Sequence, residues 1–207
     1  MLHESLWQRN QDLADQFLVH PFVHGLGDGT LDRDVFRRYV AQDAFFLRAF
    51  AKAYALAMAK CDDFPHVQEF HDLIAGVLSE LTLHADYSAS LDINLHDVEP
   101  LPATSTYTNF LISVAWHDSL AEIVAAMVPC LRLYAYIGMA LKPSLRPGNP
   151  YQGWIETYSS DEFLQLCSKL ETLLDQIGSD VASVHNAYRY ALQCELDFFS
   201  APLADRS

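Results

Sequence analysis

The stretch MVPCLRLYAYIG, residues 127–138, places a cysteine directly after a proline inside a long apolar run. A proline in a helix interior lacks the N–H donor and collides with the carbonyl four residues back. Pro129 therefore predicts a kink that leaves the carbonyl of Ala125 without its helical partner. Tyr134 follows Cys130 by four residues and shares its helix face. On this spacing alone a cysteine that packs in the core is the more common case, and a cysteine nucleophile beside a phenol is the alternative.

A cysteine nucleophile needs a partner for its proton, because the thiolate is the attacking species. Two carboxylates among apolar and aromatic residues are candidates: Asp43 in QDAFF (42–46) and Glu195 in CELDFF (194–199). A buried carboxylate has a raised pKa unless it is paired, which suits acid–base work. A helix-to-helix hydrogen bond for Asp43 and a solvated helix face for Glu195 remain open alternatives.

A metal site is a second possible chemistry. Glu80 and His84 are four residues apart and share a helix face, and Glu122 and His185 could complete a di-metal bundle. Arg189, however, follows His185 by one turn, where such sites usually carry a carboxylate or a second histidine. A cation there would repel a divalent metal. We therefore expect no metal and interpret Glu80 and His84 as a surface or interface pair.

A haem pocket is a third possibility, because HPFVH supplies His20 and His24 near the start of the chain. A haem also needs a gap of small residues on a facing helix, and no Gly-rich helical stretch is present. Lone histidines are more often packed or capping groups than ligands, so this pattern only weakly indicates haem.

These residues fall on segments with helical periodicity. The predicted helices are 31–60, 65–93, 104–117, 119–141, 160–177 and 180–199, with a shorter one at YQGWIETY (151–158). Asp32 or Thr30 is expected to cap the first, Asp118 or Ser119 the fourth, and Gly178 to end the fifth. KPSLRPGNP (142–150) predicts a loop. No stretch shows sustained strand alternation, so we predict one all-α domain over 1–207.

Composition narrows the possible partners. The chain has 207 residues, of which 51% are hydrophobic and 19% charged, which is typical of a globular protein with a sizeable core. Its formal net charge of −14 and the lack of a basic stripe argue against binding nucleic acid, because such binding depends on lysine and arginine. The same charge argues against docking on anionic membranes.

The compartment follows from the N-terminus and the cysteines. The first residues are polar and lack the apolar region of a signal peptide, so we expect a cytoplasmic protein whose four cysteines are thiols. Residues 119–141 are long enough to span a membrane but contain Glu122 and Arg132. A helix buried in a bundle accounts for them better, so we expect no membrane association.

Taken together, these segments resemble the TenA/thiaminase II family, whose fold is the heme oxygenase-like helical bundle. The resemblance covers nearly the whole chain, in order. It rests on HPFVHGLGDGTLDRDVFRRYVAQD, on SLAEIVAAMVPCLRLYAYIG and on NPYQGWIETYSSDEF. The family hydrolyses the bond at the methylene carbon of an aminopyrimidine. Its members release ammonia from 4-amino-5-aminomethyl-2-methylpyrimidine, or cleave thiamin, to give hydroxymethylpyrimidine for thiamin salvage and biosynthesis.

The resemblance also implies roles for individual residues. Cys130 would be the nucleophile that adds to the pyrimidine ring, which places the chain in the cysteine-bearing branch of the family. Asp43 would hydrogen-bond the ring nitrogen and the exocyclic amine, and Glu195 would move protons to the ring and the leaving group. The residues expected to line the pocket and position the thiol and substrate are Tyr107, Tyr134 and Tyr158.

One position departs from the family pattern, since many members carry a tyrosine where this chain has Phe46. Phenylalanine keeps a flat face for stacking on a pyrimidine but lacks the hydroxyl, which bears on rate or substrate preference. The family chemistry requires no metal or organic cofactor, and its members assemble as homotetramers. A pyrimidine-binding or regulatory protein without turnover is the alternative, and a di-metal oxidase on the same fold is the third.

Overall fold

The computed structural model describes residues 1–91 and 98–204, and the side chains of 1–81 and 98–204. These residues form α helices and one short 3₁₀ helix, with no strand among them. The helices are α1 (Leu2–Arg9), α2 (Gln11–Leu18), α3 (Pro21–Asp28), α4 (Arg33–Ala59), α5 (Phe64–Leu91), α6 (Pro102–His117), α7 (Leu120–Leu141), η1 (Lys142–Ser144), α8 (Gln152–Tyr158), α9 (Asp161–Ile177) and α10 (Ala182–Ala204). The all-α fold predicted from the sequence is confirmed.

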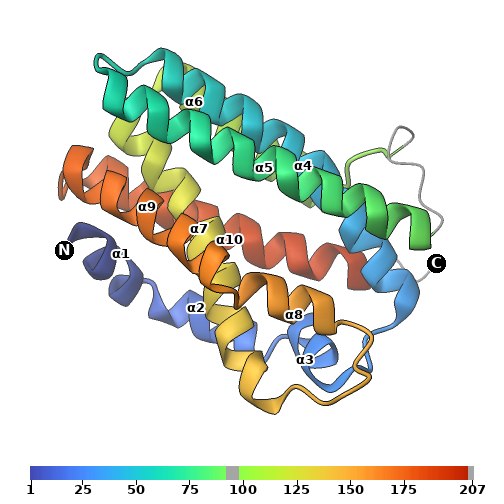
Figure 1. Cartoon of the computed structure of the whole chain (residues 1–207). Coiled ribbons are helices and arrows are strands. Elements are labelled where there is room, and N and C mark those ends of the chain that lie inside the picture. The colour runs from blue at the N-terminus through green and yellow to red at the C-terminus, as the bar shows by residue number, and fades with distance from the viewer. Residues whose placement is uncertain (92–97, 205–207) are drawn as a thin grey trace.

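The helices form a bundle with α7 and α10 packed against each other at its centre (Figure 1). Helices α4, α5 and α6 lie on one side of this pair, while α8 and α9 cover α7 on the other side. The short helices α1, α2 and α3 pack along α9, α7 and α10. Because most faces of α7 meet another helix, its long apolar sequence is buried within the bundle.

Helix α7 carries the proline that predicted a kink. It begins at a capping box. The side chain of Ser119 accepts a hydrogen bond from the backbone N–H of Glu122, and the side chain of Glu122 accepts one from the backbone N–H of Ser119. The helix then runs without a break through Pro129 to Leu141. It is long and apolar enough to cross a membrane, but 72% of its most apolar window is buried inside the protein. Protein packing therefore accounts for its hydrophobicity.

Local signals located the helix ends well. Asp32 caps α4 by accepting hydrogen bonds from the backbone N–H groups of Asp34 and Val35, at 2.7 and 3.4 Å. The loop predicted at 142–150 begins with the 3₁₀ helix η1. Before α4, helix α3 extends to Asp28 and ends at Gly29, whose φ is 78°. That left-handed conformation favours glycine.

A close helix contact holds α8 against α7. A Cβ atom on Gly138 of α7 would lie 2.7 Å from the carbonyl carbon of Tyr158 and 2.8 Å from its oxygen. Backbone atoms cannot move aside as a flexible side chain can. Gly138 therefore lets the end of α8 approach α7, one turn beyond Tyr134, and brings the rings of Tyr134 and Tyr158 to a centroid distance of 4.7 Å.

Replacing Gly138 with alanine is expected to lower the free energy of unfolding by about 1–3 kcal/mol, the usual cost of overpacking. Gly76→Ala is the matched control, because Gly76 is also helical and its added Cβ would meet only the side chain of Leu166, at 3.4 Å. That variant should be neutral or up to about 1 kcal/mol more stable, owing to higher helix propensity. Urea unfolding followed by circular dichroism measures both, and equal effects would contradict the proposed close contact.

Candidate active site

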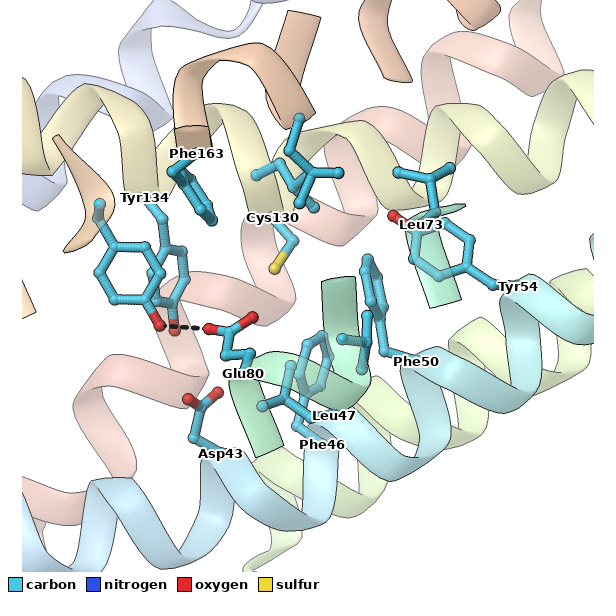
Figure 2. Close-up of a pocket in the computed structure, with 14 residues that line it drawn as sticks. Asp43, Phe46, Leu47, Phe50, Tyr54, Leu73, Glu80, Cys130, Tyr134 and Phe163 are labelled. Carbon is cyan, nitrogen blue, oxygen red and sulfur yellow. Dashed lines mark hydrogen bonds between the residues drawn. The ribbon is translucent and has the colours of Figure 1, made fainter. Parts of the chain in front are cut away.

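A cavity lies among α4, α5, α7, α8 and α9, around the thiol of Cys130 (Figure 2). It contains about 440 Å³ of space free of atoms, part of it open to solvent. The residues that line it are Asp43, Phe46, Leu47, Phe50, Tyr54, Leu73, Val77, Glu80, Cys130, Leu131, Tyr134, Tyr158, Phe163 and Leu166.

Cys130 and Tyr134 share one wall of the cavity, as their four-residue spacing predicts. Cys130 is half-buried, and its sulfur points into the space faced by the carboxyl groups of Asp43 and Glu80 (Figure 2). Cys130 thus packs against the core and also borders the cavity.

Glu195 lies on α10 behind Cys130 and is 1% exposed. Tyr107 of α6 donates a hydrogen bond from its hydroxyl to Oε1 of Glu195 at 2.9 Å, and the thiol of Cys130 donates to the same carboxyl group. The solvated face considered for Glu195 is therefore wrong. Neither Glu195 nor Tyr107 lines the cavity, so the two reach it through Cys130.

Burial determines the protonation states of Glu195 and Cys130. Removal from water raises the pKa of Glu195 to about 8, while the hydrogen bonds from Tyr107 and Cys130 oppose that rise and the charge of Asp43 adds to it. Burial also raises the pKa of the Cys130 thiol well above its usual value, with contributions from Glu195, Asp43 and Glu80. The resting thiol is therefore neutral. To react it must pass its proton to an adjacent base, and Glu195 is in hydrogen-bond contact.

Gln42 and Asp43 are neighbours on α4 but have different surroundings: Gln42 joins two helices, and Asp43 faces the cavity. Gln42 donates to the carbonyl of Glu99 at 3.0 Å and accepts from the backbone of Leu101 and the hydroxyl of Thr104, at 2.8 and 2.6 Å. These bonds tie α4 to the start of α6. Asp43 is 3% exposed and faces the cavity opposite Cys130 (Figure 2).

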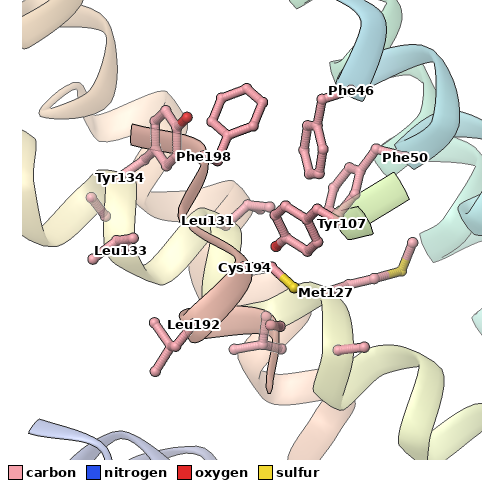
Figure 3. Packing of buried hydrophobic residues seen from close by; sticks show 14 of the residues in the cluster. Phe46, Phe50, Tyr107, Met127, Leu131, Leu133, Tyr134, Leu192, Cys194 and Phe198 are labelled. Atoms are coloured by element: carbon pink, nitrogen blue, oxygen red, sulfur yellow. The ribbon is translucent and has the colours of Figure 1, made fainter. Parts of the chain in front are cut away.

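Aromatic rings form much of the remaining wall. Phe46 lies beside Tyr107 at a centroid distance of 4.8 Å, within a packed layer that includes Phe198 (Figure 3). Phe46 thus presents a flat apolar face to the cavity. The hydroxyl of Tyr54, also on the cavity wall, has no hydrogen-bond partner among the described residues. A polar group of a bound ligand or water could therefore pair with it.

A chain of hydrogen bonds fixes Tyr134. The indole N–H of Trp154 donates to the hydroxyl of Tyr39 at 3.3 Å, and Tyr39 donates to the hydroxyl of Tyr134 at 3.0 Å. All three side chains are buried. The sequence pattern did not identify Tyr39 or Trp154 for this role, because their contact joins α4 to α8 across 115 positions of the chain.

The structure corrects the assignment of Glu80. The sequence interpretation made it half of a surface or interface pair with His84, but Glu80 lines the cavity and accepts a 2.6 Å hydrogen bond from the hydroxyl of Tyr158. The side chain of His84 lies outside the described residues. Leu73, Val77 and Glu80 share one helix face by their spacing, but the spacing does not tell whether that face lines a cavity.

The candidate metal ligands do not form one site in the structure. Glu122 caps its own helix, far along the chain from Glu80, and each lines a different cavity. His185 is bonded to Asp180. Among the residues described, no three His, Cys, Asp or Glu side chains form a group that could hold a metal ion.

The two candidate haem ligands have other partners. His20 caps α3 and bonds the hydroxyl of Ser200 at 3.0 Å. His24 is exposed and pairs with Asp28 at 3.2 Å. These are the capping and surface roles that lone histidines usually have, and neither histidine lines the cavity around Cys130.

Comparison with known proteins adds independent information. A family model described as the TENA/THI-4/PQQC family matches residues 7–201. A protein named aminopyrimidine aminohydrolase from Halalkalibacterium halodurans is 35% identical over 191 residues, which cover 88% of this chain and 84% of that protein. One of the same name from Bacillus subtilis is 34% identical, covering 78% of this chain and 70% of that protein.

Solved structures agree on the fold. The TenA homologue protein from P. horikoshii OT3 matches with a TM-score of 0.93 at 26% identity, covering 99% of both chains. A domain of unknown function with a heme oxygenase-like fold, from Shewanella denitrificans OS217, matches with a TM-score of 0.80 at 16% identity, over 98% of this chain and 92% of that one. The second likeness concerns the fold alone.

The raised pKa of Glu195 predicts a pH-dependent stability. The unfolded chain releases this proton near pH 4.5, whereas the folded protein keeps it to about pH 8. The group therefore makes the free energy of unfolding fall as pH rises across that window. Glu195→Gln should remove this fall, so that the variant gains a few kcal/mol relative to wild type between pH 5 and pH 8.

Glu122→Gln is the control for this measurement. Hydrogen bonds from Ser183 and Ser119 lower the pKa of Glu122, so its contribution is present at neutral pH and lost on acidification. Its effect should therefore have the opposite sign. Chemical unfolding at several pH values measures both, and parallel pH slopes for wild type and Glu195→Gln would contradict the buried acid.

Proposed function

Because the chain belongs to the TENA/THI-4/PQQC family, we propose that it is an aminopyrimidine hydrolase that serves thiamin salvage. Its substrate is 4-amino-5-aminomethyl-2-methylpyrimidine, from which it releases ammonia to give hydroxymethylpyrimidine, and thiamin itself is a further candidate substrate. One observation carries this proposal: the thiol of Cys130 faces the cavity in front and bonds the carboxyl group of Glu195 behind.

Binding follows from the cavity wall. Asp43 accepts hydrogen bonds from the exocyclic amine and a protonated ring nitrogen, and its burial in a cavity of limited water access strengthens both. Phe46 and Tyr134 supply aromatic surface for the flat ring. Tyr158 closes the cavity from the side of α8. The ring is thereby held with one carbon against the sulfur of Cys130.

Catalysis begins when Cys130 passes its proton to Glu195 and its sulfur adds to a ring carbon. Addition interrupts aromaticity, so the electrons of the ring can expel the amine from the exocyclic methylene. The protonated amine departs as neutral ammonia, and Glu195 keeps the thiol proton until the sulfur leaves. Water then adds to the exocyclic methylene and releases one proton, which ammonia accepts. Glu195 returns its proton to the departing sulfur as the ring regains its aromaticity.

By family resemblance, we also propose that the protein is a cytoplasmic homotetramer and uses no metal or organic cofactor. Large apolar side chains such as Trp116 and Tyr190 are exposed on the single chain, at 62% and 46%. Both belong to the α6 and α10 region, which supports burial of this side by another copy. Light scattering of the purified protein tests the assembly.

Cys130→Ser should reduce ammonia release from the aminomethylpyrimidine by roughly three or more powers of ten, because the nucleophile is lost. Cys61→Ser is the control, since Cys61 is also half-buried but bonds the carbonyl of Ala57 and lies outside the cavity. It should retain full activity. Substantial activity in Cys130→Ser would contradict the covalent route, and pyrimidine binding without turnover by wild type would favour the binding protein.

Tyr107→Phe should move the pH profile of kcat/KM. The hydroxyl of Tyr107 lowers the pKa of Glu195, so its loss raises that pKa. Activity requires Glu195 as a carboxylate in the free enzyme. In Tyr107→Phe the rise of kcat/KM near pH 8 should therefore shift to higher pH. Tyr39→Phe, which removes a bond to Tyr134 rather than to Glu195, should leave the midpoint in place. An unchanged midpoint in Tyr107→Phe would remove Glu195 from the titrating step.

A further inference from the structure

The cavity around Cys130 adjoins a second hollow on the outside of the bundle, and the two share part of their walls. The outer groove runs between α5 and α9 and contains about 1090 Å³ of space, including open solvent. Glu80, Phe163 and Leu166 line both the cavity and the groove. Glu80 therefore lies where the inner cavity meets the surface.

The carboxyl group of Glu80 has a defined orientation at this junction. The hydroxyl of Tyr158 donates to its Oε1 at 2.6 Å, and the ring of Tyr158 packs edge-on against Phe163 at 4.9 Å. Tyr158 is itself held by the close approach of α8 to Gly138. As Figure 2 shows, this carboxyl group faces the same space as the sulfur of Cys130 and the carboxyl group of Asp43.

The negative charge of Glu80 is felt inside the cavity. It contributes to the raised pKa values of Cys130, Tyr54 and Tyr158. A fixed carboxylate in a site of limited water access attracts a cationic group more strongly than it would in water. The electrostatic environment at the mouth of the cavity therefore favours a ligand whose positive charge lies beside Glu80.

The other two carboxyl groups of the site already have assigned partners. Asp43 pairs with the aminopyrimidine edge, and Glu195 exchanges a proton with Cys130. The substituent on the reacting methylene remains, and in the aminomethyl substrate this is an aliphatic primary amine, which is protonated near neutral pH. That substituent is attached to the ring held by Asp43 and Cys130, so it lies in the space that these two residues share with Glu80.

We propose that Glu80 is the specificity-determining residue of this site: its carboxylate binds the ammonium group on the reacting methylene and selects it over neutral substituents. This inference rests on the proposed function and assigns the recognition of the cationic aminomethyl group to one residue. Tyr158 acts as a positioning residue that holds the Glu80 carboxylate in place.

The test compares two ligands that differ only at the methylene, the aminomethylpyrimidine and the hydroxymethylpyrimidine. Calorimetry on Cys130→Ser protein avoids turnover, and Glu80→Gln is added to that background. Without the added change, the amine should bind roughly ten- to a hundredfold more tightly than the alcohol, the range of a charge-assisted hydrogen bond. Glu80→Gln should abolish this preference and leave binding of the alcohol within about threefold.

Two further variants sharpen the comparison. Glu162→Gln removes a carboxylate of the outer groove that does not line the cavity, so the preference for the amine should persist. Tyr158→Phe keeps Glu80 but removes its 2.6 Å hydrogen bond, and should reduce the preference by less than Glu80→Gln does. It also tests the proposal independently if Glu80→Gln fails to fold.

The possible results are distinguishable. Equal weakening of both ligands by Glu80→Gln would show a merely structural role and overturn the proposal, as would an unchanged preference. Failure of the Cys130→Ser protein to bind either ligand would overturn the proposed function, and with it the role of Glu80. If Glu80→Gln weakens binding of the amine and leaves binding of the alcohol nearly unchanged, both the proposed function and the role of Glu80 are supported.

Discussion

The burial of the Glu195 carboxyl group against the thiol of Cys130 is the interaction on which the rest of the site depends. A carboxyl group removed from water favours its protonated form, and a buried thiol favours its neutral form. Packing of α10 on α7 imposes both conditions, and α6 supplies the Tyr107 hydroxyl that keeps Glu195 within reach of ionisation. The two groups can therefore exchange one proton without exchanging it with bulk water.

The side chains in front of this pair line the cavity around the sulfur. Helix α4 presents Asp43, while Gln42 beside it fastens α4 to α6. Helices α5 and α8 present Glu80 and Tyr158 as a hydrogen-bonded unit at the mouth. Because these side chains stand on packed helices rather than on loops, the site is organised before a ligand arrives, which lowers the entropic cost of binding.

Local patterns in the sequence predicted helices α4 to α10, two candidate caps each for α4 and α7, and the shared face of Cys130 and Tyr134, because these depend on neighbouring residues. The roles of Asp43 and Glu195 came from family resemblance. Glu80 was assigned wrongly because periodicity places a residue on a face without telling which face is covered. Helix α7 continues through Pro129, because surrounding helices pack against it on most sides.

Titration of the Glu195 carboxyl carbon by carbon-13 NMR, assigned by its loss in Glu195→Gln, tests the central interaction most directly. The buried pair predicts a midpoint near pH 8 in the wild type. It also predicts a higher midpoint in Cys130→Ala, because the hydrogen bond from the thiol favours the carboxylate. A midpoint near the ordinary 4.5, unchanged when Cys130 is replaced, would contradict both the buried acid and its proton exchange with the thiol.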